Sequence, residues 1–420
     1  MKEALRLESL LENHPMLESL IQSARAHLDM LCATIPTRAV GSAGNQRATA
    51  WFAETIHAFG FMTEMPIFDC MDWSSEGATI TAGGTVFSAQ SSPYALGCDV
   101  HAPLVCVSMV SELEAAAITG KVLLLHGEIA REQLMPKHFT FYNPEEHQHI
   151  YRLLETNPPA AIITATGRNP DMAGALYPFP MFEDGDFDIP SVYLTDDEGA
   201  QIARHTGQRL HLVSHAQRRA SSGCNVIARK AGNAAGRIVV MAHIDAKAGT
   251  PGALDNAAGV VTLLLLAESL INASGQYSIE IVALNGEDYY ATPGELDYLR
   301  RNEGRFDDIA LGINMDGLGY IAGQTAYSLY ECPAALSERL RATLAKYPGL
   351  SEGQPWYQGD HMLLIMQGRP VLALTSQCAN ELLANVIHTA NDTPAQVDPA
   401  RLAEAALALH TVIAQMQQTT

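Results

Sequence analysis

The stretch from residue 237 to residue 288 constrains the fold of this chain more than any other part of its sequence. It holds an apolar segment, "RIVVMAHID", a loop rich in glycine and proline, a second apolar segment, "DNAAGVVTLLLLAESLI", and then "YSIEIVALNGED". The first and last segments are short and rich in β-branched residues, as buried strands are, while the middle one has the length of a buried helix. A strand, a helix and a strand in this order predict a parallel sheet covered by helices.

The same alternation continues to the end of the chain. "IALGINMDGLG" and "RPVLALTS" are predicted strands, "ELDYLRRN" is a predicted helix, and "DPARLAEAALALHTVIAQM" is a long closing helix with Asp398 and Pro399 as its start signal. Residues 16–33 and 44–59 also carry apolar positions at helical spacing. We therefore predict an α/β domain with a mostly parallel central sheet flanked by helices.

A different pattern occupies the region between these parts. "ATITAGGTVFSAQ", "PLVCVSMV" and "KVLLLHG" are short apolar or alternating runs separated by glycine, proline and serine, and 145–156 is a helix candidate. This pattern predicts a β-rich module inserted at 73–221. Residues 1–72 would then supply the N-terminal helices and a strand of the α/β domain, and 222–420 the rest of it.

Charge and cysteine usage exclude several classes of partner. The formal net charge of −20, from 46 acidic and 26 basic residues, argues against nucleic acid or an anionic membrane as the main partner. The charged N-terminal stretch has no apolar core typical of a signal peptide, and no later run predicts a membrane span. Seven scattered cysteines without a CxxC motif indicate reduced thiols. We expect a cytoplasmic protein.

Polar side chains follow three consecutive predicted strands, at the edge where ligands bind in open α/β sheets. These residues are His243 with Asp245, Glu287 with Asp288, and Asp316. Asp255 precedes the next helix and His388 lies in a C-terminal loop. Taken singly, Asp255 could be only a helix N-cap, and most of the fifteen histidines are expected to be surface or core residues. Together, these imidazoles and carboxylates form a mixed ligand set that suits divalent zinc, cobalt or manganese.

Six short motifs that hold or adjoin these residues occur in order over residues 223–420. They are "AHID", "GALDNAAG", "NGED", "NMDGLG", "GDH" and "IHTANDT". The series resembles that of the zinc-dependent aminopeptidases of metallopeptidase family 28. The segments "ITGKVLLLHG", "PAAIITA" and "IPSVYLTDDEG" resemble the protease-associated (PA) domain that some members insert before the metal-binding half. The resemblance implies a di-zinc exopeptidase-like fold with a PA-like insertion, and an aminopeptidase that acts on peptides.

The resemblance also assigns roles to the residues at the strand ends. Two divalent ions are implied, with zinc favoured and cobalt or manganese also suited. One ion would take His243 and Asp316, the other Asp288 and His388, with Asp255 bridging both. Glu287 would be the general base, and Asp245 would orient the imidazole of His243. A cis peptide bond between Asp255 and Asn256 is a further implication.

This chain departs from the family pattern at one ligand. The family's acid pair is usually Glu-Glu, whereas this chain has Glu287 and Asp288. Because aspartate is one methylene shorter, we expect the second ion to sit differently or to bind less tightly. A solvated acid is the alternative interpretation of Asp288. Asp360 and His361 are expected to line the substrate side or to support the ligands, with helix capping as the alternative. Ile387 stands where the carboxypeptidase branch tends to carry tyrosine, which favours an aminopeptidase.

Two other functions stay open at this point. The first is a single-zinc glutaminyl cyclase on the same fold, which the number of bound ions would distinguish. The second is a non-catalytic binding protein of the transferrin-receptor kind, against which the complete ligand set argues. The sequence determines neither the preferred N-terminal residue nor the peptide length, the native metal, the role of the PA-like domain or the oligomeric state, for which a homo-oligomer remains open.

Overall fold

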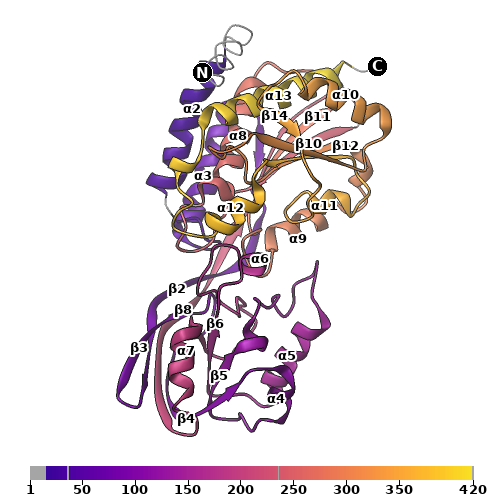
Figure 1. Cartoon of the computed structure of the whole chain (residues 1–420). Coiled ribbons are helices and arrows are strands. Elements are labelled where there is room, and N and C mark those ends of the chain that lie inside the picture. Colours follow the sequence, from indigo (N-terminus) through magenta and orange to yellow (C-terminus); the bar gives the residue numbers. More distant parts are fainter. Residues whose placement is uncertain (1–15, 36, 235, 419–420) are drawn as a thin grey trace. The chain divides into compact units, whose positions relative to one another are not determined.

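The computed structural model describes residues 16–35, 37–234 and 236–418 of the 420-residue chain. The chain divides into two compact units, shown in Figure 1. We call Met1–Cys70 with Ser222–Thr420 the sheet unit, and Met71–Ser221 the barrel unit. The chain enters the barrel unit through strand β2 (Ile67–Ala82) and leaves it through β8 (Arg209–Cys224). The boundaries expected from the sequence, 73 and 221, lie within two residues of this division.

The sheet unit contains a mixed eight-stranded sheet in the order β1-β9-β11-β10-β12-β15-β13-β14. Its strands are β1 (Met62–Glu64), β9 (Val226–Lys230), β10 (Arg237–His243), β11 (Ser278–Leu284), β12 (Ile309–Met315), β13 (Thr325–Tyr330), β14 (Leu350–Glu352) and β15 (Val371–Ser376). The four central strands, β11, β10, β12 and β15, are parallel to one another. The β1–β9, β9–β11 and β13–β15 pairs are antiparallel. The centre of the sheet is therefore parallel and its outer parts are mixed.

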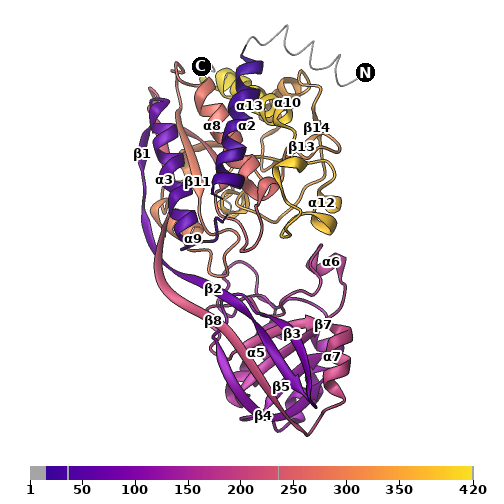
Figure 2. The ribbon, with the colours of Figure 1, turned by 90° about the vertical axis from the view of Figure 1, so that its left-hand side faces the viewer.

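Helices cover both faces of this sheet. On one face α8 (Ala258–Ser269) packs on β10 and β11, while α2 (Leu17–Asp29), α3 (Ala43–Ala58) and α13 (Pro399–Gln417) pack around α8, as Figures 1 and 2 show. Further helices are α9 (Pro293–Arg301), α10 (Ala334–Leu344), α11 (Met362–Ile365) and α12 (Ala379–Asn385). On the opposite face, the Tyr298 hydroxyl of α9 donates to Glu280 of β11 at 2.9 Å. The sheet unit is thus a helix–sheet–helix sandwich.

The side-chain pattern explains why α8 lies in the middle of this unit. Every residue from Ala258 to Ala267 is buried, so the helix is apolar on all sides and needs neighbours all round. Alternate residues of β10, Ile238, Val240 and Ala242, share its hydrophobic core. The α13 helix begins at Pro399, and the carboxylate of Asp398 accepts a hydrogen bond from the amide of Ala400, as its start signal predicts.

The barrel unit is a closed barrel in the order β2-β3-β7-β6-β5-β4-β8. Its remaining strands are β3 (Thr85–Ser91), β4 (Cys98–Val107), β5 (Val122–His126), β6 (Ala161–Thr166) and β7 (Ser191–Thr195). Its helices are α4 (Val110–Ala115), α5 (Glu145–Thr156), α6 (Pro170–Ala173) and α7 (Asp196–Ala203). Strands β4 to β7 pair in parallel in chain order. The predicted helix over 145–156 is confirmed, whereas the likeness to a PA domain stays a prediction.

Two sequence-based expectations concern the ends of the chain and membranes. Within the described ranges, no helix is both long enough and apolar enough to cross a bilayer. Most of the charged, amphipathic stretch at the N-terminus lies outside the described residues.

Candidate metal centre

Three adjacent parallel strands bring the predicted ligands to one edge of the sheet. His243 is the last residue of β10, Asp316 follows the last residue of β12, and Asp288 lies in the loop after β11. In the β10–β11 ladder, His243 stands opposite Leu284, so both strands finish at the same level. This is the carboxyl edge of the sheet, where open α/β folds bind their ligands.

Asp255 reaches this edge from the loop between β10 and α8. Gly252 has a left-handed backbone (φ 58°), and the segment Ala253–Ala257, whose backbone is non-helical at Asp255 and Asn256, then leads into α8. The Asp255–Asn256 peptide bond is cis, as the family resemblance implied. The side chain of Asn256, not that of Asp255, accepts from the amide of Gly259 at 3.0 Å at the start of the helix. The carboxylate of Asp255 therefore has another use than helix capping.

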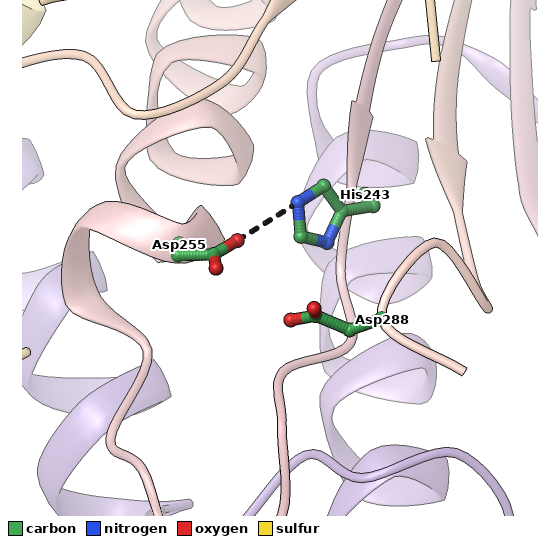
Figure 3. A group of neighbouring side chains, drawn as sticks. All are labelled: His243, Asp255 and Asp288. Atoms are coloured by element: carbon green, nitrogen blue, oxygen red, sulfur yellow. Dashed lines mark ion pairs between the residues drawn. The ribbon is translucent and has the colours of Figure 1, made fainter. Parts of the chain in front are cut away.

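The carboxylate of Asp255 lies between two histidines. Its Oδ1 is 3.1 Å from Nε2 of His243, and its Oδ2 is 2.9 Å from Nε2 of His388. Each histidine has a second acid beside the same nitrogen: Asp316 Oδ1 lies 3.6 Å from Nε2 of His243, and Asp288 Oδ1 lies 3.1 Å from Nε2 of His388. Figure 3 shows the side chains of His243, Asp255 and Asp288 converging from three separate segments. All five predicted ligand positions therefore meet in one place.

These spacings fit a metal site. Ligand atoms at about 2.0–2.1 Å from a tetrahedral zinc ion are about 3.3 Å apart, close to the separations found here. The ligand atoms of His243, Asp255 and Asp288 lie within 4.8 Å of one another. Both ring nitrogens of His243 are buried and have no hydrogen-bond partner among the described residues. His388 has a left-handed backbone (φ 63°), a conformation rare outside glycine that is typical of functional positions.

The electrostatics of the cluster call for positive charge. Burial opposes protonation of His243, but Asp245, Asp255 and Asp316 raise its pKa well above the ordinary value. The pKa of His388 is likewise raised, because Asp288 and Asp255 outweigh its burial. Burial favours the neutral form of Asp255, yet the two imidazoles hold its pKa below the usual range. Buried carboxylates packed this closely need cations between them, which a divalent ion supplies.

Asp245 contacts both the imidazole of His243 and the loop that carries the acid pair. Its carboxylate is fully buried, and its Oδ1 lies 3.7 Å from Nδ1 of His243. The same carboxylate accepts from the amides of Gly286 at 2.7 Å and Asp288 at 3.0 Å. It therefore fixes the loop that carries the acid pair as well as standing beside the imidazole.

Glu287 lies on this loop and is half-buried. Burial raises its pKa well above the ordinary value, His243 opposes the rise, and the nearby acids Asp288, Asp316 and Asp360 add to it. A carboxyl group with a raised pKa beside a metal centre has the properties of a general base.

Asp360 and His361 lie close to the ligands. A Cβ added at Gly359 would be 3.3 Å from Oδ2 of Asp316, which places this segment against that acid. His361 has its Nε2 2.9 Å from the carbonyl oxygen of Trp356, and its ring packs on the indole with centroids 4.1 Å apart. The His361 side chain makes no capping bond to α11 within the described chain. Both carboxylate oxygens of Asp360 are buried without a hydrogen-bond partner among the described residues.

Sequence analysis missed three buried charged residues near the centre, Arg38, Glu295 and Asp392. Glu295 is 3% exposed, and its Oε2 lies 3.2 Å from where a Cβ on Gly286 would stand. It occurs at the start of a helix, where acids are common on the surface, so nothing local marked its burial. Arg38 falls in a loop rich in turn residues, and Asp392 in the loop after His388. Only their three-dimensional partners distinguish them from solvated side chains.

Comparison with known proteins agrees with this geometry. Residues 225–413 match the model of Peptidase family M28. This part of the sheet unit is therefore similar to the peptidase domains of family M28. The match begins with β9 and covers every predicted ligand, so the predicted family resemblance of this half of the chain is confirmed.

Individual relatives of the M28 domain extend the comparison. The probable lipoprotein aminopeptidase LpqL of Mycobacterium tuberculosis is 26% identical over 309 residues, which cover 70% of this chain and 58% of that protein. The chain thus spans little more than half the length of this relative. The fold of BSAP, a zinc aminopeptidase from Bacillus subtilis, superposes with a TM-score of 0.74 at 18% identity, covering 95% of each chain. Glutaminyl cyclase from Porphyromonas gingivalis has a TM-score of 0.50 at 15% identity, covering 95% of this chain and 98% of that one.

Proposed function

We propose that this chain is a metallo-aminopeptidase that hydrolyses N-terminal residues from peptides with two divalent metal ions, for which zinc is favoured. One observation carries the proposal: the two oxygens of Asp255 are directed to two different histidines, at 3.1 and 2.9 Å. A carboxylate placed in this way is suited to bridge a pair of ions. The M28 domain and the aminopeptidase named among its relatives support the same activity.

The side chains divide into two ligand sets that share Asp255. His243 and Asp316 would complete one set, and His388 and Asp288 the other. Two ions bound there would lower the pKa of a shared water and polarise the peptide carbonyl. Asp288 is held by its own backbone amide on Asp245 and by its Oδ2, which accepts from the amide of Lys247 at 3.2 Å. Its short side chain thus has a fixed position beside His388.

Glu287 would act as the general base. It is the acid of this loop that belongs to neither ligand set, and burial makes its carboxylate more basic. It would take a proton from the attacking water and deliver it to the leaving amine. Asp245 would hold the His243 imidazole and the loop of Glu287 together, which keeps base and ligands in register.

A glutaminyl cyclase is the second candidate, because one such enzyme has a related fold. A one-ion enzyme needs one ligand set, whereas this chain has two sets of competent side chains around Asp255. We therefore favour the aminopeptidase. We further propose that the barrel unit is a PA-like domain, which assays on substrate peptides of decreasing length would test. We also propose a cytoplasmic location, which cell fractionation would test.

A panel of chromogenic aminoacyl anilides tests the proposal directly. We expect hydrolysis of substrates with a free amino group, no hydrolysis of their N-acetylated counterparts, loss of activity in chelator and recovery with zinc, cobalt or manganese. Elemental analysis should find two ions per chain. Full activity with one ion or none would contradict the two-ion mechanism, and cyclisation of glutaminyl peptides without anilide hydrolysis would favour the cyclase.

A further inference from the structure

The backbone that carries Asp255 is held by two buried charged residues from distant parts of the sequence. Arg38 comes from the loop between α2 and α3, and Asp392 from the loop four residues after His388. Their side chains are 1% and 0% exposed. Neither belongs to the ligand sets described above.

Arg38 binds four backbone carbonyl oxygens. Its Nε donates to Ile244 at 3.0 Å, and its Nη1 donates to Leu31 at 2.7 Å and to Pro251 at 2.8 Å. Its Nη2 donates to Gly252 at 2.7 Å. The planar guanidinium thus joins the end of β10 to the loop before Asp255, a geometry that the point charge of a lysine does not reproduce.

Asp392 holds the next three residues by their amides. Its Oδ1 accepts from Leu254 at 2.7 Å and its Oδ2 from Asp255 at 3.1 Å. Its own carbonyl oxygen accepts from Ala253 at 3.2 Å. Asp392 lies on the loop that carries His388, and the imidazole of His388 lies beside Oδ2 of Asp255. These bonds therefore connect the backbone of Asp255 to the loop of that histidine.

Together, Arg38 and Asp392 bind one backbone group of each residue from 251 to 255. Arg38 takes two successive carbonyl groups and Asp392 the three successive amides that follow. A Cβ at Gly252 would lie 2.8 Å from Nη2 of Arg38 and 2.5 Å from the carbonyl oxygen of Asp255, so the segment also fits closely. A backbone fixed at each residue leaves the Asp255 side chain few directions to point.

We infer that Arg38 and Asp392 are positioning residues that hold Asp255 in its bridging orientation before any metal binds. Burying a guanidinium against neutral carbonyls and a carboxylate against amides has a desolvation cost, and apolar residues of similar volume are often as stabilising. Placement of one functional carboxylate explains why charged groups occupy both positions. This inference rests on the metal centre proposed above.

The test compares two variants with matched controls. Arg38→Lys keeps the charge but loses the planar set of donors, and Asp392→Asn keeps the shape but loses the charge and one acceptor. Arg237→Lys is the first control, because Arg237 is 5% exposed and begins β10, at the opposite end from His243. Asp184→Asn is the second, because Asp184 of the barrel unit also accepts from two amides, those of Lys137 and Asp186, at 2.7 and 2.8 Å.

Zinc affinity, measured by competition with a chromophoric chelator, is the main readout. Groups that orient metal ligands typically contribute 10- to 100-fold to affinity, so we expect Arg38→Lys and Asp392→Asn to weaken binding by about that factor. Both controls should lower the melting temperature and leave the Kd for zinc unchanged. Equal losses of thermal stability in all four variants with no change in Kd would overturn the inference.

Hydrogen exchange of the metal-free protein gives a second readout. The amides of Leu254 and Asp255 should exchange faster in Arg38→Lys and Asp392→Asn than in the wild-type protein, and at the wild-type rate in both controls. Unchanged exchange in both variants would contradict the inference. If the wild-type protein binds zinc but hydrolyses no aminoacyl substrate, the proposed activity fails while the effects on affinity still support positioning. A wild-type protein that binds no zinc overturns both.

Discussion

The sheet unit and the barrel unit both contain parallel strands followed by polar residues, yet their strand ends differ in chemistry. In the sheet unit, β10 ends at His243, whose two ring nitrogens have no hydrogen-bond partner among the described residues. In the barrel unit, β6 ends at Thr166, whose hydroxyl donates to the carbonyl of Phe179 at 2.8 Å and accepts from its amide at 3.0 Å. Strand β7 ends at Thr195, which forms a reciprocal capping box with Glu198 at the start of α7.

The end of a strand determines where a side chain lies. The groups around that side chain determine whether it is occupied by local hydrogen bonds or can bind a ligand. Thr166 and Thr195 are fully used in holding local backbone, so they stabilise the barrel unit and offer nothing to a ligand. Buried carboxylates show the same contrast. Asp184 accepts from two backbone amides, whereas the two oxygens of Asp255 are directed to two imidazoles.

The largest expected effect comes from removing the shared ligand. Asp255→Ala should abolish the binding of both ions and all hydrolysis, because each ligand set loses a member. Thr166→Ala, at a strand end of the barrel unit, should leave metal content and activity unchanged. Elemental analysis and anilide hydrolysis measure both variants. Retention of one tightly bound ion in Asp255→Ala would show that the two sets are independent.

Glu287→Gln should separate the base from the ligands. The amide has nearly the shape of the carboxylate but accepts no proton, and general bases typically contribute 10²- to 10⁴-fold. We expect both ions to remain bound and kcat to fall by at least about 100-fold. Near-normal turnover in a fully metal-loaded variant would show that another group takes the proton.

Burial lowers the pKa of His27, whereas neighbouring acids raise the pKa of His243. His27 on α2 packs edge-on against Trp51, with ring centroids 5.4 Å apart, and burial lowers its pKa to about 4. Since its pKa rises to the ordinary value on unfolding, the unfolded state binds the extra proton, and stability falls as pH drops from about 6.5 towards 4. Denaturant titrations at pH 7 and pH 5 should show a loss of stability to which His27 contributes about 2 kcal/mol, so that His27→Gln reduces the loss by about that amount. An equal loss in the variant would assign the pH effect to other groups.

The smallest effect is expected at the capped strand end. Thr195→Ala removes the hydroxyl that accepts from the amide of Glu198 and should reduce the free energy of unfolding of the barrel unit by about 1 kcal/mol. Zinc affinity should not change. Urea titration followed by a probe in the barrel unit measures the effect, and a changed Kd for zinc would show that the two units are energetically coupled.

Much of the fold followed from local patterns in the sequence. The helix over 145–156 agrees with α5 residue for residue, and the apolar runs that lead to His243 and Asp316 are strands β10 and β12. Periodicity and strand-end chemistry are properties of short segments, so one sequence is enough to reveal them. The strand β13 was not recognised, although its segment "TAYSLY" is aromatic and mostly buried.

The residues that sequence analysis missed depend on distant partners. Arg38 binds the carbonyl of Ile244, 206 residues away, and Asp392 binds the amide of Leu254, 138 residues away. An arginine in a turn-rich loop and an aspartate after a histidine look like solvated side chains until the chain is folded. A buried charge is therefore the class of functional residue that local patterns reveal least.

The division of the sheet unit into two chain segments sets an order of events during translation. Helix α2 packs on α13, and about 390 residues separate the end of α2 from the end of α13. At about 5–20 residues per second, a ribosome needs roughly 20–80 s to make them. The apolar side of α2, formed by Leu17, Leu20, Ala24 and Leu28, packs on both α8 and α13, and the whole barrel unit is synthesised before either of these helices. The nascent chain thus exposes an apolar helix face before its partner helices exist. We expect chaperones that cover this N-terminal segment to increase the yield of folded protein in the cell.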